Sequence, residues 1–291
     1  MQRQFSVLLC LMVLCLFCGC GARHDMRGQP TFVEVNKVTL GYRVVGSGPP
    51  LLLIMGYAGT MDVWDTAMVA ELAHQRSVIL FDNRGMGYSD IDDTPLTVKL
   101  MASDALALLD AMGVEKADVM GWSMGSIIAQ EMALHAPTRV GKVILYGTAV
   151  DSMPVKVALD RMGTLSHAEF IVELFPDSWK MLHPRVYSSL PTPAIEPAAA
   201  VIERQYQALV NWPGTRERLA SLENETLVIV GQDDRITPPK QALTAAELID
   251  GAWVVRFKGA GHWLMYQAGK DLARTVVHFL EVQENLIMNA Q

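Results

Sequence analysis

Short, predominantly apolar runs recur along this chain, and stretches of helical periodicity separate them. The runs cover residues 51–55, 78–81, 117–120, 143–146, 226–230 and 253–257. A strand whose apolar residues do not alternate with polar ones is covered on both faces, as strands of a parallel sheet are. Strands that alternate with helices therefore predict an α/β fold with a mostly parallel, doubly covered sheet.

The remaining elements follow from the same periodicities. Two apolar runs flank a polar turn within residues 31–45, which predicts a β-hairpin ahead of the sheet. Helical spacing predicts helices over about 62–75, from 95 to 113, from 124 onward, over 239–249 and over 269–283.

One long segment, between Ala149 and about Asn224, interrupts the alternation of strands and helices. It contains helical stretches at 168–175 and 198–212 and no convincing strand pattern. A segment this long is not an ordinary loop. We therefore expect a helical cap over 151–221, inserted between the two parts of an α/β core, 31–150 and 222–291.

The composition excludes several classes of function. Apolar residues make up 51% of the chain and charged residues 19%, which excludes a disordered protein. A net charge of −7 argues against a nucleic-acid partner, because binding phosphates needs a basic face. The chain has no P-loop, no GxGxxG motif and no pair of CxxC motifs, so neither a metal nor an organic cofactor is expected.

The first thirty residues have the organisation of an export signal. A short cationic start precedes an apolar run over 5–17, which is too short for a comfortable membrane span of about 20 residues. All four cysteines lie in this region, at Cys10, Cys15, Cys18 and Cys20. The pattern predicts a signal peptide over 1–19 and a tether over 20–30.

The end of this signal, Gly19-Cys20, resembles a bacterial lipobox, although Phe17 and Cys18 depart from the preferred residues. The resemblance implies lipidation of Cys20 and attachment to a membrane of the cell envelope, on the outer side of the inner membrane or in the outer membrane. Plain secretion to the periplasm or medium and an uncleaved anchor are the alternatives.

The pattern Gly121-Trp122-Ser123-Met124-Gly125 stands between a predicted strand and a predicted helix. A glycine two residues to either side of Ser123 allows a tight, strained turn without a Cβ clash. The turn lifts the hydroxyl off the sheet and aims the positive end of the helix at it. Ser123 is therefore the predicted nucleophile.

A nucleophilic serine needs a base that takes its proton and an acid that orients the base. Among the histidines, His262 alone follows a strand on a glycine-rich loop. The acid is expected just after the strand 226–230, where Asp234 is the first choice and Asp233 the second. Asp151, after the strand 143–146, is a more distant candidate.

Together, the order Ser123, Asp234, His262 and the run Phe81-Asp-Asn-Arg-Gly-Met-Gly-Tyr-Ser-Asp90 resemble the α/β-hydrolase fold over roughly 31–285. In that run Asp82 and Arg84 are expected to brace loops beside the site. The resemblance implies an oxyanion hole made by the backbone N–H groups of Tyr57 and Met124. Met55 stands where the family usually has histidine.

These residues predict a serine hydrolase, most simply a carboxylesterase that cleaves small or medium apolar esters through an acyl-enzyme. Met55, Trp122 and Trp263 are the candidate pocket residues. Ser123-Met124 and Gly261-His262-Trp263 also resemble carbon–carbon bond hydrolases, and a cofactor-free haloperoxidase or perhydrolase would use the same triad. The alternative from a different functional class is a non-catalytic surface-binding protein on a hydrolase scaffold.

Overall fold

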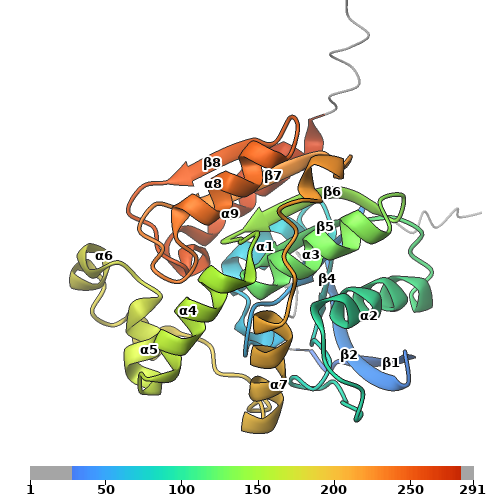
Figure 1. Ribbon diagram of the computed structural model, residues 1–291, viewed down its shortest axis with the longest axis horizontal. Helices are drawn as coiled ribbons and strands as arrows, with labels where there is room; N and C mark the ends of the chain where they lie inside the picture. The colour runs from blue at the N-terminus through green and yellow to red at the C-terminus, as the bar shows by residue number, and fades with distance from the viewer. Residues whose placement is uncertain (1–27, 283–291) are drawn as a thin grey trace, which may run out of the picture.

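A computed structural model describes residues 28–282 of the chain, which form one mostly parallel eight-stranded sheet with helices against it (Figure 1). The strands are β1 (Thr31–Val35), β2 (Val38–Val45), β3 (Pro50–Ile54), β4 (Ser77–Phe81), β5 (Ala117–Trp122), β6 (Val140–Tyr146), β7 (Thr226–Gly231) and β8 (Trp253–Phe257), in the spatial order β1-β2-β4-β3-β5-β6-β7-β8. The hairpin strands β1 and β2 pair antiparallel, and β2 also pairs antiparallel with β4. The strands from β3 to β8 pair parallel with one another. The predicted fold class is confirmed.

Helices bury the sheet because its central strands are apolar on both faces. Each residue from Leu51 to Ile54 in β3 has an exposed fraction of 0%. The covering helices are α1 (Thr66–Ala73), α2 (Val98–Ala111), α3 (Met124–His135), α8 (Pro239–Leu248) and α9 (Leu264–Glu281), with α1 packed on α9 and α2 on α3. The helix expected from 62 is a 3₁₀ turn, η1 (Met61–Val63), followed by α1. Helix α9 begins at Leu264, earlier than expected, and is kinked at Ala268.

Residues 151–221, which we call the cap, are helical and lie to one side of the sheet (Figure 1). The cap contains α4 (Ser152–Gly163), α5 (His167–Glu173), α6 (Asp177–Leu182), η2 (Val186–Ser189), α7 (Ala199–Val210) and η3 (Leu219–Ser221). Helices α5 and α7 occupy the two stretches where helical spacing was noted. Helix α4, which follows β6 after the short connection 147–151, was not expected.

Two predictions about the N-terminus, the signal peptide over 1–19 and lipidation of Cys20, lie outside the described residues. Within 28–282, no helix combines the length and the apolar character that crossing a membrane requires.

The crossing of α3 over β3 and β5 is closer than side chains permit. A Cβ atom on Gly125 would lie 1.9 Å from the carbonyl oxygen of Ile54, and one on Gly121 would lie 2.1 Å from the oxygen of Gly125. No real Cβ contact is this short, and the obstacle in both cases is backbone, which cannot rotate away. Glycine at these two positions is therefore a packing requirement of the α3 crossing.

We predict that Gly125→Ala lowers the free energy of unfolding by about 1–3 kcal/mol or more, because the methyl group forces α3 away from β3. The matched control is Gly163→Ala in α4, where a Cβ meets nothing within 4 Å; its effect should stay within about 0.5 kcal/mol. Urea unfolding of both variants measures the difference. Equal midpoints for the two variants would contradict the close crossing.

Candidate active site

Ser123 lies in the sharp turn between β5 and α3, with φ +55° and ψ −120°. A non-glycine residue rarely adopts a positive φ, and such a conformation costs on the order of 1–3 kcal/mol. The neighbouring backbone holds it there: Ser123 N–H donates to the Tyr146 carbonyl at 2.9 Å, and Ser126 N–H donates to the Ser123 carbonyl at 2.9 Å. The turn places the hydroxyl at the carboxyl end of the sheet and at the N-terminus of α3.

The structure brings His262, from the loop after β8, against Asp234, from the loop after β7. His262 Nδ1 lies 2.8 Å from Asp234 Oδ2. The other carboxylate oxygen, Oδ1, accepts the backbone N–H groups of Ile236 at 2.8 Å and Thr237 at 2.9 Å. The Thr237 hydroxyl donates to Oδ2 at 2.9 Å. Asp234 is thus a buried carboxylate that is fully hydrogen-bonded and aimed at the imidazole ring.

The two other candidate acids point elsewhere. Asp233 is exposed, and its backbone N–H donates to the Ala260 carbonyl at 2.8 Å. Asp151 forms an ion pair with Arg216 at 2.5 Å. Of the three candidates, Asp234 alone contacts His262.

The carbonyl of His262 accepts two side-chain hydrogen bonds that sequence reasoning did not anticipate. Tyr146, at the end of β6, donates its hydroxyl at 2.7 Å, and Trp122 donates its indole Nε1–H at 3.0 Å. Burial raises the pKa of Tyr146 well above its usual value, so the hydroxyl stays protonated and remains a donor. The only sequence signal for Tyr146 was its position at the end of β6, the strand next to β5 in the parallel sheet.

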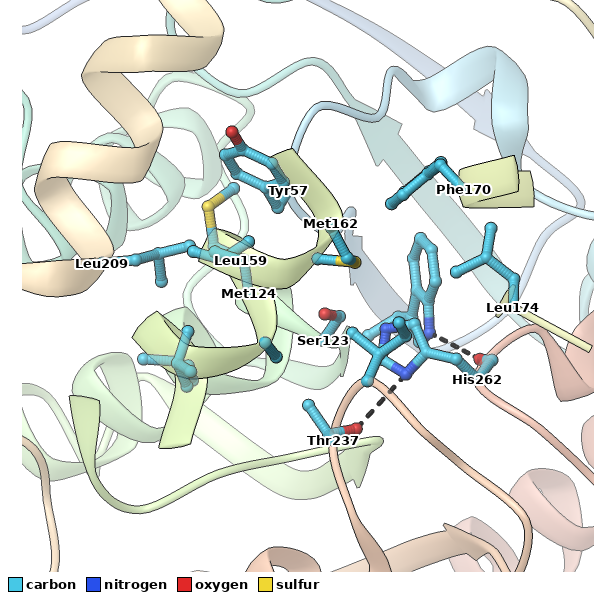
Figure 2. Close-up of a pocket in the computed structure, with 15 residues that line it drawn as sticks. Tyr57, Ser123, Met124, Leu159, Met162, Phe170, Leu174, Leu209, Thr237 and His262 are labelled. Atoms are coloured by element: carbon cyan, nitrogen blue, oxygen red, sulfur yellow. Dashed lines mark hydrogen bonds between the residues drawn. The ribbon is translucent and has the colours of Figure 1, made fainter. Parts of the chain in front are cut away.

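Ser123 and His262 line one apolar cavity between the core and the cap (Figure 2). Its volume is about 40 Å³, room for a few water molecules. The lining comes from the elbow, from cap helices α4, α5 and α7, and from the acid and base loops: Tyr57, Trp122, Ser123, Met124, Ile127, Val155, Ala158, Leu159, Met162, Phe170, Leu174, Leu209, Ile236, Thr237 and His262. None of these described lining residues is Asp, Glu, Lys or Arg.

Two of the three predicted pocket residues do not line this cavity. Trp122 does, whereas Met55 is fully buried and its side chain packs beside Gly59, inside the core. Trp263 lies behind Trp122, with ring centroids 6.2 Å apart, and against Phe175 at 5.8 Å. In this structure, side chains of the cap fill the part of the cavity wall for which Met55 and Trp263 were candidates. The position of the cap could not be worked out from the sequence.

The turn Gly56–Gly59 abuts the elbow: a Cβ atom on Gly56 would lie 3.1 Å from the Cβ of Ser123. Across the described chain, neither the N–H of Tyr57 nor that of Met124 donates to a protein acceptor. Burial and the nearby Glu203 raise the pKa of the Tyr57 phenol to about 12, so the ring is neutral. The two amides expected to form the oxyanion hole thus have no protein acceptor within residues 28–282.

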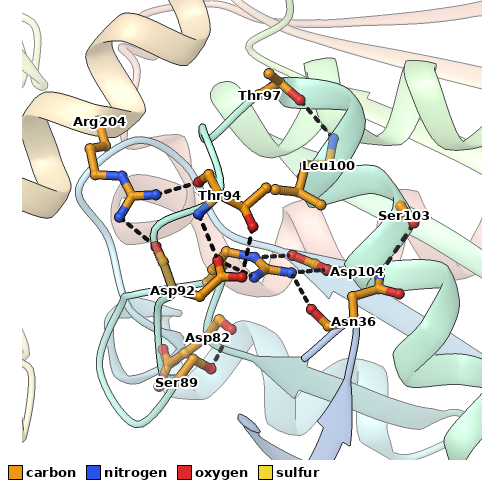
Figure 3. A network of polar contacts seen from close by, with 11 residues as sticks. Asn36, Asp82, Ser89, Asp92, Thr94, Thr97, Leu100, Ser103, Asp104 and Arg204 are labelled. Carbon is orange, nitrogen blue, oxygen red and sulfur yellow. Dashed lines mark hydrogen bonds and ion pairs between the residues drawn. The ribbon is translucent and has the colours of Figure 1, made fainter. Parts of the chain in front are cut away.

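The loop after β4 is braced by buried charges (Figure 3). Both Asp104 oxygens accept from Arg84, at 2.8 and 2.7 Å, and Asp92 accepts from the same guanidinium at 2.9 Å. The Asp82 carboxylate accepts the backbone N–H groups of Met61 at 2.6 Å and Tyr88 at 2.9 Å. These contacts agree with a bracing role, and none of them reaches the cavity. Nowhere within 28–282 do three or more His, Cys, Asp or Glu side chains gather as metal ligands would.

Comparisons with known proteins agree on one family. A sequence profile described as the alpha/beta hydrolase fold matches residues 49–182. The 2-hydroxymuconate semialdehyde hydrolase of Pseudomonas sp. strain CF600 is 31% identical over 248 residues, which cover 81% of this chain and 88% of the relative. A putative carbamate hydrolase, RutD, of Azorhizobium caulinodans is 30% identical, over 77% of this chain and 88% of the relative. Among solved structures, a thermophilic esterase from Thermogutta terrifontis superposes with a TM-score of 0.74 at 26% identity, over 87% of this chain and 97% of that one.

Burial raises the pKa of the Asp82 carboxyl group to about 6. The effect of burial is larger than the opposing effect of the backbone hydrogen bonds that the carboxylate accepts. A carboxyl group with a raised pKa binds its proton more tightly in the folded than in the unfolded chain. Its stabilising contribution is therefore complete below pH 4 and is lost as the pH rises through 6. The shift corresponds to a loss of about 3 kcal/mol. We predict that wild type loses this much relative to Asp82→Asn between pH 4 and pH 8 in urea unfolding; parallel pH profiles would contradict the raised pKa.

Proposed function

The chain belongs to the α/β-hydrolase fold family and is a hydrolase of the serine type, and we propose that Ser123, His262 and Asp234 are its catalytic triad. The observation that carries the proposal is the 2.8 Å contact between His262 Nδ1 and Asp234 Oδ2, made by a histidine that lines the same cavity as Ser123. With Nδ1–H donating to the carboxylate, Nε2 is the free base on the other side of the ring. Figure 2 shows the Ser123 hydroxyl on the side of the cavity that His262 faces.

The reaction then follows the order of these groups. His262 Nε2 takes the Ser123 proton while the hydroxyl oxygen attacks a carbonyl carbon. The N–H groups of Tyr57 and Met124 stabilise the oxyanion, each by a factor on the order of 100–1,000 in rate. The imidazolium, whose charge Asp234 stabilises, returns the proton to the leaving group. Water then hydrolyses the acyl-serine by the same path.

The 2-hydroxymuconate semialdehyde hydrolases among the relatives favour a carbon–carbon bond hydrolase over a carboxylesterase. We therefore propose hydrolysis of a carbon–carbon bond beside a ketone as the first candidate. Such a bond breaks only when the departing carbon leaves as an enolate, so the substrate carries a second carbonyl conjugated to it. The enolate takes the proton that His262 removed from Ser123, so this step needs no other proton donor.

The cavity restricts the substrate further. A carboxylate that enters a buried cavity needs a cationic partner there, and none of the described lining residues is cationic. We propose that the part of the substrate that occupies this cavity is uncharged and apolar. The uncharged, apolar lining also suits a second candidate substrate, an ester of a short apolar acid. The likeness to an esterase structure supports this candidate. Haloperoxidase or perhydrolase activity stays a prediction on the same triad.

Two substrates with the same short acyl group distinguish these candidates: a β-diketone and a p-nitrophenyl ester. We predict the highest kcat/KM for the β-diketone, and a loss on the order of 10⁴–10⁶ for Ser123→Ala with every substrate that is cleaved. Asp234→Asn should lose about 10⁴, while Asp233→Asn, the matched control, should stay within about threefold of wild type. Turnover of the ester alone would select the second candidate. If a fluorophosphonate failed to label Ser123 in folded protein, the protein would be a non-catalytic one.

We also propose that the chain is attached to a cell-envelope membrane through acyl groups on Cys20, since several acyl chains give stable anchoring where one is marginal. Cells fed radiolabelled palmitate should incorporate it into the wild-type chain and not into Cys20→Ala. Equal labelling of the two proteins, or none of either, would rule out lipidation at this residue.

A further inference from the structure

A second hollow, which we call the outer groove, lies against the cavity that Ser123 lines. Its walls come from residues 57–58, from most of 159–165, from Phe170 on α5, and from Glu203 and Tyr206 on α7. Its volume is about 570 Å³, against about 40 Å³ for the cavity. The cavity therefore holds only a small part of a substrate, and the outer groove has room for the rest.

Four side chains form a partition between the two spaces, because Tyr57, Leu159, Met162 and Phe170 line both. Met162 and Leu159 have exposed fractions of 8% and 7%, and the other two residues are half-buried, so all four also face solvent. Figure 2 shows Tyr57, Met162 and Phe170 on the side of the cavity that is opposite Thr237. The partition is thin and includes an unbranched methionine, which changes shape easily.

The order of the proposed reaction assigns one part of the substrate to each space. The acyl part stays bonded to Ser123 after the first step, whereas the leaving part departs before water attacks the acyl-enzyme. A leaving part that lies beyond the partition, in the outer groove, reaches solvent without passing the acyl part. The walls of the outer groove therefore contact the leaving part.

Of the two carboxylates in the wall of the outer groove, that of Asp160 is already neutralised. Its Oδ2 pairs with Lys156 Nζ at 2.5 Å, one turn away on α4. Its Oδ1 accepts the hydroxyl hydrogen of Tyr206 at 2.6 Å. Asp160 thus adds little net charge to the groove.

The other carboxylate, that of Glu203, has no cationic partner. Glu203 is exposed, and within 28–282 it forms no ion pair; its Oε1 accepts the neutral amide Nε2 of Gln207 at 2.8 Å. The neighbouring Arg204 donates instead to the carbonyls of Asp92 and Thr94, as Figure 3 shows. After burial, the charge of Glu203 is the next cause of the raised pKa of the Tyr57 phenol, so its field acts at the partition.

We propose that Glu203 is a specificity-determining residue, which favours substrates whose leaving part is neutral or cationic and rejects those whose leaving part is anionic. The inference rests on the proposed function, because a leaving part exists only if Ser123 is acylated. A fixed charge a few ångströms from a charged group in a partly solvated groove changes binding by several-fold, and repulsion of the wrong partner gives specificity.

The test uses three aryl substrates with one acetyl group and leaving parts of one shape, in which the para substituent is tert-butyl, trimethylammonio or sulfonate. Both β-diketones and esters are made, so that either proposed reaction can be followed. We expect Glu203→Gln to lower kcat/KM for the trimethylammonio substrate by about 3- to 10-fold and to raise it for the sulfonate by a similar factor. The tert-butyl substrate should stay within about twofold, and Glu203→Lys should enlarge both changes. Each factor compares one substrate between two enzymes, so the reactivity of the leaving part cancels.

Glu247→Gln is the matched control. It makes the same change in net charge at an exposed residue of α8, a helix that lines neither the cavity nor the outer groove. Its ratio of trimethylammonio to sulfonate kcat/KM should stay within about 1.5-fold of wild type, because charges beyond a Debye length of about 10 Å are screened. Raising the salt to about 0.5 M should reduce the effects of Glu203→Gln.

Two outcomes overturn the inference. Glu203→Gln would change all three substrates by the same factor, or Glu247→Gln would change the ratio as much as Glu203→Gln does. Failure of the proposed function gives a different result, since wild type would then cleave none of the substrates and would not react with a fluorophosphonate.

Discussion

The approach of α3 to the sheet is the constraint on which the site depends. Because Gly121 and Gly125 have no Cβ, the first turn of α3 lies against the backbone of Ile54 at a distance that no side chain allows. Ser123 lies at the apex of this crossing and accepts a positive φ as a result. The strain is held by the parallel pairing of β5 with β6, through which Ser123 N–H reaches the Tyr146 carbonyl. The proposed nucleophile is thus placed by backbone packing, not by its own side chain.

The proposed base, His262, is held by a second set of contacts that leaves one side of its ring free. Asp234 takes the Nδ1 side, while Tyr146 and Trp122 hold the backbone carbonyl of the same residue. All of these partners come from the carboxyl ends of parallel strands or the loops that follow them. Strands that run in the same direction bring their carboxyl ends to one edge of the sheet, which is where ligands bind in open α/β folds.

The cap supplies what the core lacks, an apolar wall over Ser123. Helices α4, α5 and α7 line the cavity with aliphatic and aromatic side chains and no charge. Helix α7 also reaches the turn at Ala58 through Gln205. One docked helix therefore contacts both the cavity and the turn at Ala58.

Local patterns in the sequence determined a large part of this structure. Apolar runs placed the strands, because a parallel strand buried on both faces leaves an unmistakable run, and the glycine spacing around Ser123 placed the elbow. Spacing after a strand also favoured Asp234 over Asp233, since the register of a loop is a local property. Only the tertiary structure decided which side chains meet over Ser123. It excluded Met55 and Trp263 from the cavity and introduced Thr237, Tyr146 and Gln205, because those contacts join segments that are distant in sequence and depend on how the cap packs on the sheet.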